Sequence, residues 1–96
     1  MRDLKQDLEL TEQVRYKYLH FEFLGVEEKE GKYTVWVCKN NKNPDVWLGF
    51  VVWYERWKQY CFEPIGSKIF SADCLADVKD FVDRVNWEHK EGRGER

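Results

Sequence analysis

The side chains best suited to nucleophilic or metal chemistry in this sequence are its cysteines and histidines: Cys38, Cys61, Cys74, His20 and His89. Zinc sites usually take pairs of ligands that lie a few residues apart, and no such pair occurs among these positions. We therefore expect free thiols in a reducing compartment and no metal site. A disulfide between Cys38 and Cys61 remains open only if their strands are neighbours.

A catalytic thiol–imidazole pair would require Cys61 or Cys74 beside His20, and nothing in the spacing of these residues favours it. Cys74 falls on the apolar stripe of a predicted helix, where a thiol is inert. The sequence also shows no glycine-rich phosphate loop, serine elbow or His-Glu metal motif. We expect a protein that is not an enzyme, with no catalytic residue and no cofactor.

The element that places Cys74 is a C-terminal helix. Ser71 is a suitable N-cap, and Phe70 before it fits a hydrophobic staple with Leu75. Apolar residues recur at helical steps: Cys74, Leu75, Val78, Phe81, Val82 and Val85. We expect this stripe to be buried, so that Leu75→Ala or Phe81→Ala would each cost about 2–5 kcal/mol. The opposite face is predicted to be a solvated row of aspartates: Asp73, Asp77, Asp80 and Asp83.

Strand-like alternation precedes this helix. It begins at Tyr16, resumes over residues 32–39 and continues through 47–54 and 57–63, and Ile69-Phe70 fits a short edge strand. Gly25 to Gly31 predicts a charged turn, and residues 40–45 predict a loop. The fold class is therefore α+β, an antiparallel sheet of four to five strands with one C-terminal amphipathic helix packed on one face.

The two ends of the chain carry weaker patterns than the domain between them. Residues 1–15 predict an N-terminal arm or short helix, 16–87 a single α+β domain, and 88–96 a flexible polar tail. The N-terminal residues lack the apolar block of a signal peptide. The longest apolar run, Val46 to Tyr54, is far shorter than the roughly 20 residues of a membrane helix. We expect a cytoplasmic protein with no membrane contact.

The hairpin formed by the third and fourth strands is apolar on both faces. Its turn is either a two-residue loop at Glu55-Arg56 or a four-residue loop closed by Trp53 and Lys58, and both place Val51 opposite Tyr60. One face then carries Gly49, Val51, Trp53, Tyr60 and Phe62. We expect this face beneath the helix, with Gly49 allowing the helix to approach the backbone.

The second face of the hairpin mixes apolar and polar residues: Leu48, Phe50, Val52, Tyr54, Trp57, Gln59, Cys61 and Glu63. One helix covers only one face of a sheet, so this face is left for the N-terminal arm, another subunit or a ligand. A bulge in either strand would exchange the faces.

Two segments of the chain, LGFVVWYERWKQYCFEP and KIFSADCLADVKDFVDRVN, resemble a family of small uncharacterised proteins from bacteria, archaea and phages. The matching positions are Leu48, Gly49, Trp53, Trp57, Lys58, Gln59, Tyr60, Phe62, Pro64, Cys74 and Leu75. Lys58 stands where the family usually has Arg, which weakens any planar bidentate contact there. The resemblance covers roughly residues 32–86 and implies a stand-alone domain, without an established activity.

The aromatic content predicts an interaction or oligomerisation domain. Five Trp, five Tyr and six Phe, each able to bury roughly 150–250 Å², exceed what the core of a 96-residue chain encloses. We expect the second face of the sheet to bind a protein partner or a second copy of the chain. The candidate binding residues are Phe50, Val52, Tyr54, Arg56, Trp57 and Gln59.

The alternative function is a nucleic-acid-binding module that uses a basic aromatic sheet surface in residues 31–70. That segment holds six Lys or Arg against three acids, and aromatic sheets can stack single-stranded bases. An αβββα order would also be similar to double-stranded RNA binders. Against this function stand the net charge of −2, the pI of about 5.7 and the absence of an aromatic-glycine RNA-binding motif.

Overall fold

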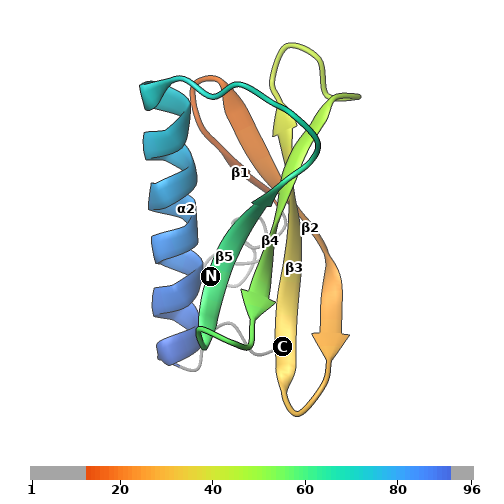
Figure 1. Ribbon diagram of the computed structural model, residues 1–96, viewed down its shortest axis with the longest axis vertical. Helices are drawn as coiled ribbons and strands as arrows, with labels where there is room; N and C mark the ends of the chain where they lie inside the picture. The colour runs from red at the N-terminus through yellow and green to blue at the C-terminus, as the bar shows by residue number, and fades with distance from the viewer. Residues whose placement is uncertain (1–12, 92–96) are drawn as a thin grey trace, which may run out of the picture.

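The strands follow one another across a single antiparallel sheet in the computed structural model, which describes residues 13–91. The elements are β1 (Gln13–Arg15), β2 (Leu19–Glu28), β3 (Lys32–Asn40), β4 (Trp47–Tyr54), β5 (Gln59–Pro64) and α2 (Ala72–Lys90). Each strand pairs with its neighbour in sequence, in the order β1-β2-β3-β4-β5. Helix α2 lies along one face of this sheet (Figure 1), and this two-layer arrangement confirms the predicted α+β class.

Helix α2 begins as its sequence predicts. The Ser71 side-chain Oγ accepts a hydrogen bond from the backbone N–H of Cys74 at 3.1 Å, which satisfies one of the free donors at the helix start. The helix ends at Lys90, three residues into the segment predicted as tail, and within this extension His89 packs against the ring of Trp53 at 4.7 Å between centroids. Residues 92–96 of that tail lie outside the described residues.

The buried stripe of α2 is narrower than predicted. Val78, Phe81 and Val85 are buried, and Cys74 and Val82 are partly buried against them, whereas Leu75 is 51% exposed. The prediction that Leu75 belongs to the core is wrong. Cys74 occupies the position in line with Val78 and Phe81, and Leu75 lies a further 100° around the helix, at the flank of the stripe.

The core lies between α2 and the sheet face that carries Phe21, Trp36, Cys38, Val51 and Tyr60. The ring of Phe81 stacks on Phe21 at 4.0 Å and meets the edge of Trp36 at 5.1 Å. The face that carries Val51 and Tyr60 therefore lies beneath the helix, as predicted. The Tyr60 hydroxyl is buried in this layer, and its oxygen accepts the backbone N–H of Thr34 at 3.0 Å.

The β4–β5 register differs from the prediction by two residues. Val51 pairs with Phe62 and Trp53 pairs with Tyr60, and a shift of two leaves every side chain on its predicted face. The connection is a four-residue loop, Glu55 to Lys58, in which only Lys58 takes a left-handed backbone with φ of 54°. A two-residue hairpin loop would place both Glu55 and Arg56 in that region, which is unfavourable for residues with long side chains.

The ring of Phe62, and not helix α2, lies against the backbone at Gly49. A Cβ atom at this position would lie 2.5 Å from Cζ of Phe62 and 2.7 Å from the backbone oxygen of Glu63. The prediction that Gly49 allows the helix to approach the backbone is therefore wrong, and the close approach is made by the neighbouring strand β5. The ring of Phe62 in turn meets Phe70, at 5.7 Å between centroids.

Three further boundaries differ from the sequence-based expectation. Strand β2 continues through Gly25 to Glu28 by way of a bulge between Phe23 and Gly25, so the predicted turn is confined to residues 29–31. Ile69-Phe70 is not a strand, and Ile69 is 99% exposed. Gln13–Arg15, expected within an arm, form the edge strand β1, and the short helix suggested for earlier residues lies outside the described residues.

The cysteines are free thiols on different parts of the fold. Cys38 in β3 and Cys61 in β5 are separated by β4, and their pairing partners Gly49 and Val52 place them on opposite faces. The conditional disulfide between them is therefore excluded. Burial raises the pKa of the Cys38 thiol to about 12, which leaves it unreactive in the folded protein.

Candidate functional site

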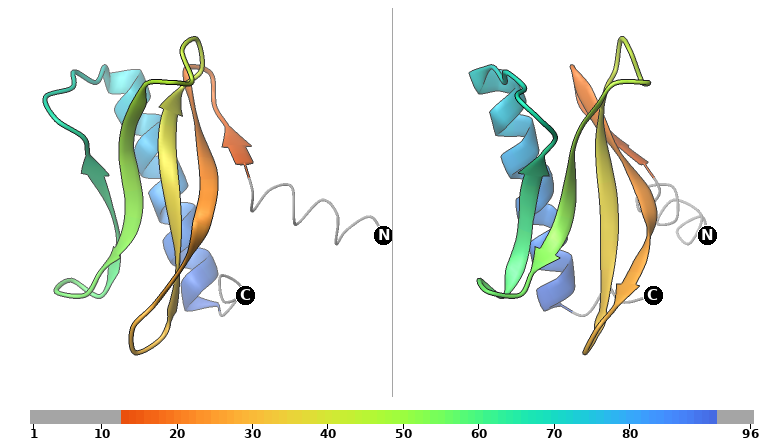
Figure 2. Two further views of the ribbon diagram at one scale, coloured as in Figure 1. Left: turned by 90° about the vertical axis from the view of Figure 1, so that its right-hand side faces the viewer. Right: turned by 45° about the vertical axis from the view of Figure 1, so that its right-hand side comes forward.

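The candidate site is the sheet face opposite α2, here called the open face. The view in Figure 2 (left) looks onto this face, with α2 behind the sheet. Within residues 13–91, no helix or strand lies over it. His20 and Val37 of this face are buried, so the surface available for contact lies toward β4 and the β4–β5 loop, where Trp47, Tyr54 and Trp57 are exposed.

Strand pairing arranges the side chains of the open face in rows. One row runs Arg15, His20, Lys39, Trp47 and the next runs Gln13, Glu22, Val37, Phe50, Glu63. Farther along the β4–β5 hairpin, Val52 pairs with Cys61 and Tyr54 with Gln59. The β1–β3 corner of the face is thus polar, and the β3–β5 side is apolar.

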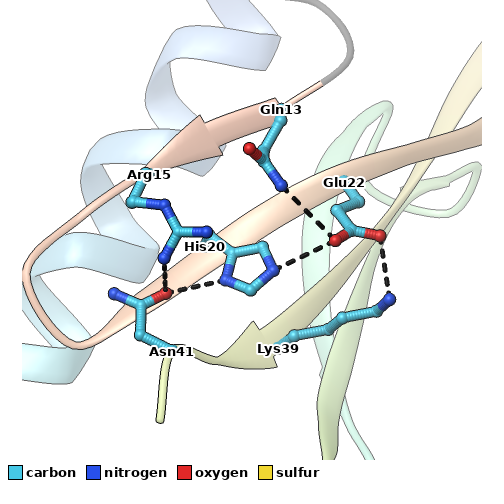
Figure 3. Close-up of polar contacts among 6 residues, drawn as sticks. All are labelled: Gln13, Arg15, His20, Glu22, Lys39 and Asn41. Atoms are coloured by element: carbon cyan, nitrogen blue, oxygen red, sulfur yellow. Dashed lines mark hydrogen bonds and ion pairs between the residues drawn. The ribbon is translucent and has the colours of Figure 1, made fainter. Parts of the chain in front are cut away.

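The polar corner is a closed network, here called the polar cluster: Gln13, Arg15, His20, Glu22, Lys39 and Asn41 (Figure 3). His20 lies at its centre and is only 2% exposed. Its Nδ1 lies 2.7 Å from Oδ1 of Asn41, and its Nε2 lies 3.1 Å from Oε2 of Glu22.

Asn41 fixes the role of His20 in this network. The Asn41 Nδ2 donates to the backbone oxygens of Tyr16 at 2.8 Å and Lys17 at 3.1 Å, so its Oδ1 is the atom that accepts from Arg15 and faces Nδ1 of His20. Both ring nitrogens of His20 therefore face acceptors, an amide oxygen and a carboxylate. Neither nitrogen faces a thiol, so the structure does not join His20 to Cys61 or Cys74.

Lys39 links Glu22 of the polar cluster to the apolar side of the face. A hydrogen bond from Nζ of Lys39, 2.8 Å from Oε1, together with the hydrogen bond from His20, holds the pKa of Glu22 below its ordinary value. The same Lys39 Nζ lies 5.4 Å from the ring centroid of Trp47, within the range of a cation–π contact.

The apolar side of the open face is here called the aromatic strip: Trp47, Phe50, Val52, Tyr54 and Trp57. Its rings meet edge to face in two pairs, Trp47 with Phe50 at 6.0 Å and Tyr54 with Trp57 at 5.0 Å. Phe50 and Val52 are half-buried, whereas Trp57 is 62% exposed. The strip therefore offers several aromatic surfaces to a contacting molecule.

The structure brings most of the sequence-predicted binding residues together. Phe50, Val52 and Tyr54 belong to the aromatic strip, and Gln59 pairs with Tyr54 across the hairpin. Arg56 lies in the exposed β4–β5 loop beside Trp57.

Sequence reasoning missed Trp47 because β4 contains a bulge. Cys38 pairs with Gly49 but Lys39 pairs with Trp47, which leaves Leu48 without a partner on β3. Leu48 packs against the core instead of lying on the second face, so that assignment is wrong, and Trp47 takes the open face. No residue type at this point marks the bulge in the sequence. The polar cluster was also missed, although the alternation of His20 and Glu22 with apolar residues was a signal for it.

The edges of the sheet are less available than its open face. At the outer edge of β5, the Asn86 side chain accepts the Tyr60 N–H at 2.6 Å and donates to the Tyr60 carbonyl at 3.2 Å. Pro64, which has no N–H, ends the strand, and the other edge strand, β1, has three residues. The Asn86 contact and Pro64 disfavour strand addition at β5. At the other side β1 covers β2 only from His20 to Glu22.

The charges near the aromatic strip are partly neutralised within the fold. Glu55 forms an ion pair with Lys58 and also accepts from Nε1 of Trp53 at 2.8 Å. The hydrogen bond from Lys58 lowers the pKa of Glu55 and raises that of Lys58. Arg56 and Glu63, at opposite ends of the hairpin, are exposed and form no ion pair within residues 13–91.

Comparison with known proteins finds a small phage protein. The chain is 26% identical over 61 residues to an "Uncharacterized 9.3 kDa protein" of Acholeplasma phage L2, and the match covers 64% of this chain and 78% of the phage protein. No family model and no solved structure matches the chain. The likeness is to a small uncharacterised phage protein, and it carries no activity.

Two other kinds of site are not found in the part of the chain that the structure describes. No group of three or more His, Cys, Asp or Glu side chains is placed to hold a metal ion. No described helix combines the length and the apolar character required to cross a membrane.

Proposed function

We propose that this chain is a small non-catalytic interaction module that binds another protein chain through its open face. The observation that carries the proposal is the aromatic strip, whose Trp and Tyr rings lie beside a polar cluster on a face that no described element covers. An apolar centre rich in Trp and Tyr with a polar rim is typical of protein–protein interfaces.

The paired charges favour a protein partner over nucleic acid. A surface that binds single-stranded nucleic acid needs cations free to contact phosphates. On the open face, Lys39 is held by Glu22, and Glu63 adds a negative charge beside Phe50. In the β4–β5 loop, Lys58 is held by Glu55. Binding of nucleic acid through residues 31–70 remains the alternative proposal.

The contacts of the nucleophilic groups favour a non-catalytic role. Both ring nitrogens of His20 are engaged with Asn41 and Glu22. Cys61, the thiol on the open face, has a pKa raised by burial, which disfavours the reactive thiolate. A nucleophile with an adjacent base, which covalent catalysis requires, is not assembled by these residues.

The experiment that tests this function is selection of peptides from a random display library against the full chain, followed by titration of the recovered peptides. Trp57→Ala removes an exposed ring of the strip and is expected to weaken binding about tenfold or more, as for an interface hot spot. The matched control is Leu75→Ala, which removes an exposed apolar side chain from the helix side of the molecule.

Two results would overturn the proposal. One is that no peptide binds, or that the recovered peptides bind both variants as tightly as the unmodified chain. The other is salt-dependent binding of single-stranded oligonucleotides that Trp57→Ala abolishes, which would favour the nucleic-acid alternative.

A further inference from the structure

The β4–β5 hairpin carries opposite unpaired charges at its two ends. Arg56 lies in the loop that joins the strands, and Glu63 lies near the far end of β5, opposite Phe50. Both are exposed, and neither forms an ion pair within the described part of the chain. The neighbouring charged residues Glu55 and Lys58 neutralise each other, so Arg56 and Glu63 are the charges of the hairpin left for a partner.

Two copies of this hairpin are complementary when one is reversed on the other. Consider two open faces stacked on each other, with a two-fold axis between them that is parallel to both sheets and perpendicular to their strands. This axis reverses the strand direction and keeps the side-to-side order of the strands. Arg56 of each copy then lies toward Glu63 of the other, twice by symmetry. Within the aromatic strip, the same axis places Phe50 toward Trp57 and Val52 toward Tyr54.

We propose that the partner of the open face is a second copy of this chain, in a two-fold dimer joined by the aromatic strip and by two Arg56–Glu63 ion pairs. This inference rests on the proposed function and adds the identity of the partner. A clear apolar centre between reciprocal charges is the pattern that a self-complementary interface requires.

The other simple two-fold arrangement is disfavoured by the polar cluster. An axis parallel to the strands reverses their lateral order and lays β1 and β2 over β4 and β5. The ion pair of Glu22 with Lys39 would then be pressed against the apolar rings of the strip, at a cost in desolvation. The perpendicular axis instead places the polar cluster over the far end of the β2–β3 hairpin, which is also polar and carries the ion pairs Glu27–Lys29 and Glu28–Lys32.

The test is sedimentation equilibrium of the full chain with charge reversal at each end of the hairpin. We expect reversible dimers, weakened about tenfold or more by Arg56→Glu or by Glu63→Arg, because each variant places like charges together twice. A mixture of the two variants is expected to regain dimers, because both cross-subunit pairs then have opposite signs. Lys79→Glu, a charge reversal on the exposed side of α2, is the control and should not change association.

Each other outcome decides against the dimer in a distinct way. A chain that stays monomeric at millimolar concentration overturns the second copy as partner. Dimers that the reversals weaken but the mixture does not restore overturn the two-fold arrangement. If the chain is monomeric and yet display peptides discriminate Trp57→Ala from Leu75→Ala, the open face is an interaction site for a different protein. If both experiments fail, the proposed function itself fails.

Discussion

Gly49 is the residue at which the sheet accepts an aromatic ring directly against its backbone. We predict that Gly49→Ala destabilises the protein by about 1–3 kcal/mol, since the new Cβ would meet the Phe62 ring and the Glu63 carbonyl oxygen well inside contact distance. The carbonyl belongs to the backbone of β5 and cannot rotate away, so the strand must move. Urea unfolding followed by circular dichroism measures the change.

Gly25 provides the matched control for this substitution. It also lies in a strand, but a Cβ atom there would have no neighbour within 4 Å. Gly25→Ala is expected to be neutral or to stabilise by up to about 1 kcal/mol through the unfolded chain. Equal costs at the two positions would show that backbone entropy, and not the approach of Phe62, explains the role of Gly49.

Glu22 gives the polar cluster a pH dependence of defined sign. Its folded-state pKa lies below the ordinary value of 4.5, so its contribution to stability is fully present above that pH and is lost as the pH falls through the folded-state value. We therefore predict that the difference in unfolding free energy between the unmodified chain and Glu22→Gln narrows as the pH falls below 4.5. Urea unfolding at a series of pH values measures it.

The comparison for Glu22→Gln is Asp45→Asn, which removes an exposed acid between β3 and β4 that has no ion pair within residues 13–91. The difference in unfolding free energy between this variant and the unmodified chain should stay nearly constant over the same pH range. A constant difference for Glu22→Gln as well would mean that the contacts with Lys39 and His20 contribute no net stability.

At the scale of single residues, the sequence predicted which side of a strand faces the core better than it predicted individual burial. Alternation placed Val51 and Tyr60 correctly, because a period of two survives a register shift of two. It failed at Leu48 and Trp47, where a bulge exchanges the faces, and at Leu75, where two adjacent apolar residues compete for one helical position. Tertiary packing decides both cases, and a single sequence does not encode it locally.

Helix α2 is packed on the sheet by a few buried side chains. We predict that Phe81→Ala costs about 3–5 kcal/mol, because this ring is buried between Phe21 and Trp36, whereas Leu75→Ala costs about 0.5 kcal/mol or less. Thermal or urea unfolding of the two variants measures this difference. Similar costs for both would mean that the helix is rotated about its axis from the orientation described here.

The elements themselves followed from the sequence more reliably than their connections. The helix start at Ser71 and the four long strands were predicted because capping and alternation are local signals. The three-residue strand β1 was missed, since its pairing with β2 and not its own composition defines it. Within the extension of α2 to Lys90, His89 contacts Trp53, and these two residues lie far apart in the sequence.

At the scale of the whole molecule, a single described helix packs on a five-stranded sheet, and this arrangement determines where the candidate site lies. The helix buries one sheet face, and the other sheet face is the open face. The aromatic excess predicted that such a surface exists. The polar cluster at its corner depends on β1, β2, β3 and the β3–β4 loop coming together, which no local pattern indicates.

The three cysteines allow occupancy of this surface to be measured in the intact protein. Cys61 is half-buried on the open face, Cys74 is half-buried under the helix stripe, and Cys38 is fully buried. We predict that an occupant of the open face, whether a peptide or a second copy, slows alkylation of Cys61 and leaves Cys74 unchanged as an internal reference. Mass spectrometry of each cysteine during iodoacetamide treatment measures the rates. If Cys61 kept its rate under saturating ligand, Cys61 would not lie on the surface that binds. Alkylation of Cys38 as fast as that of Cys61 would mean that the rates report opening of the fold and not surface exposure.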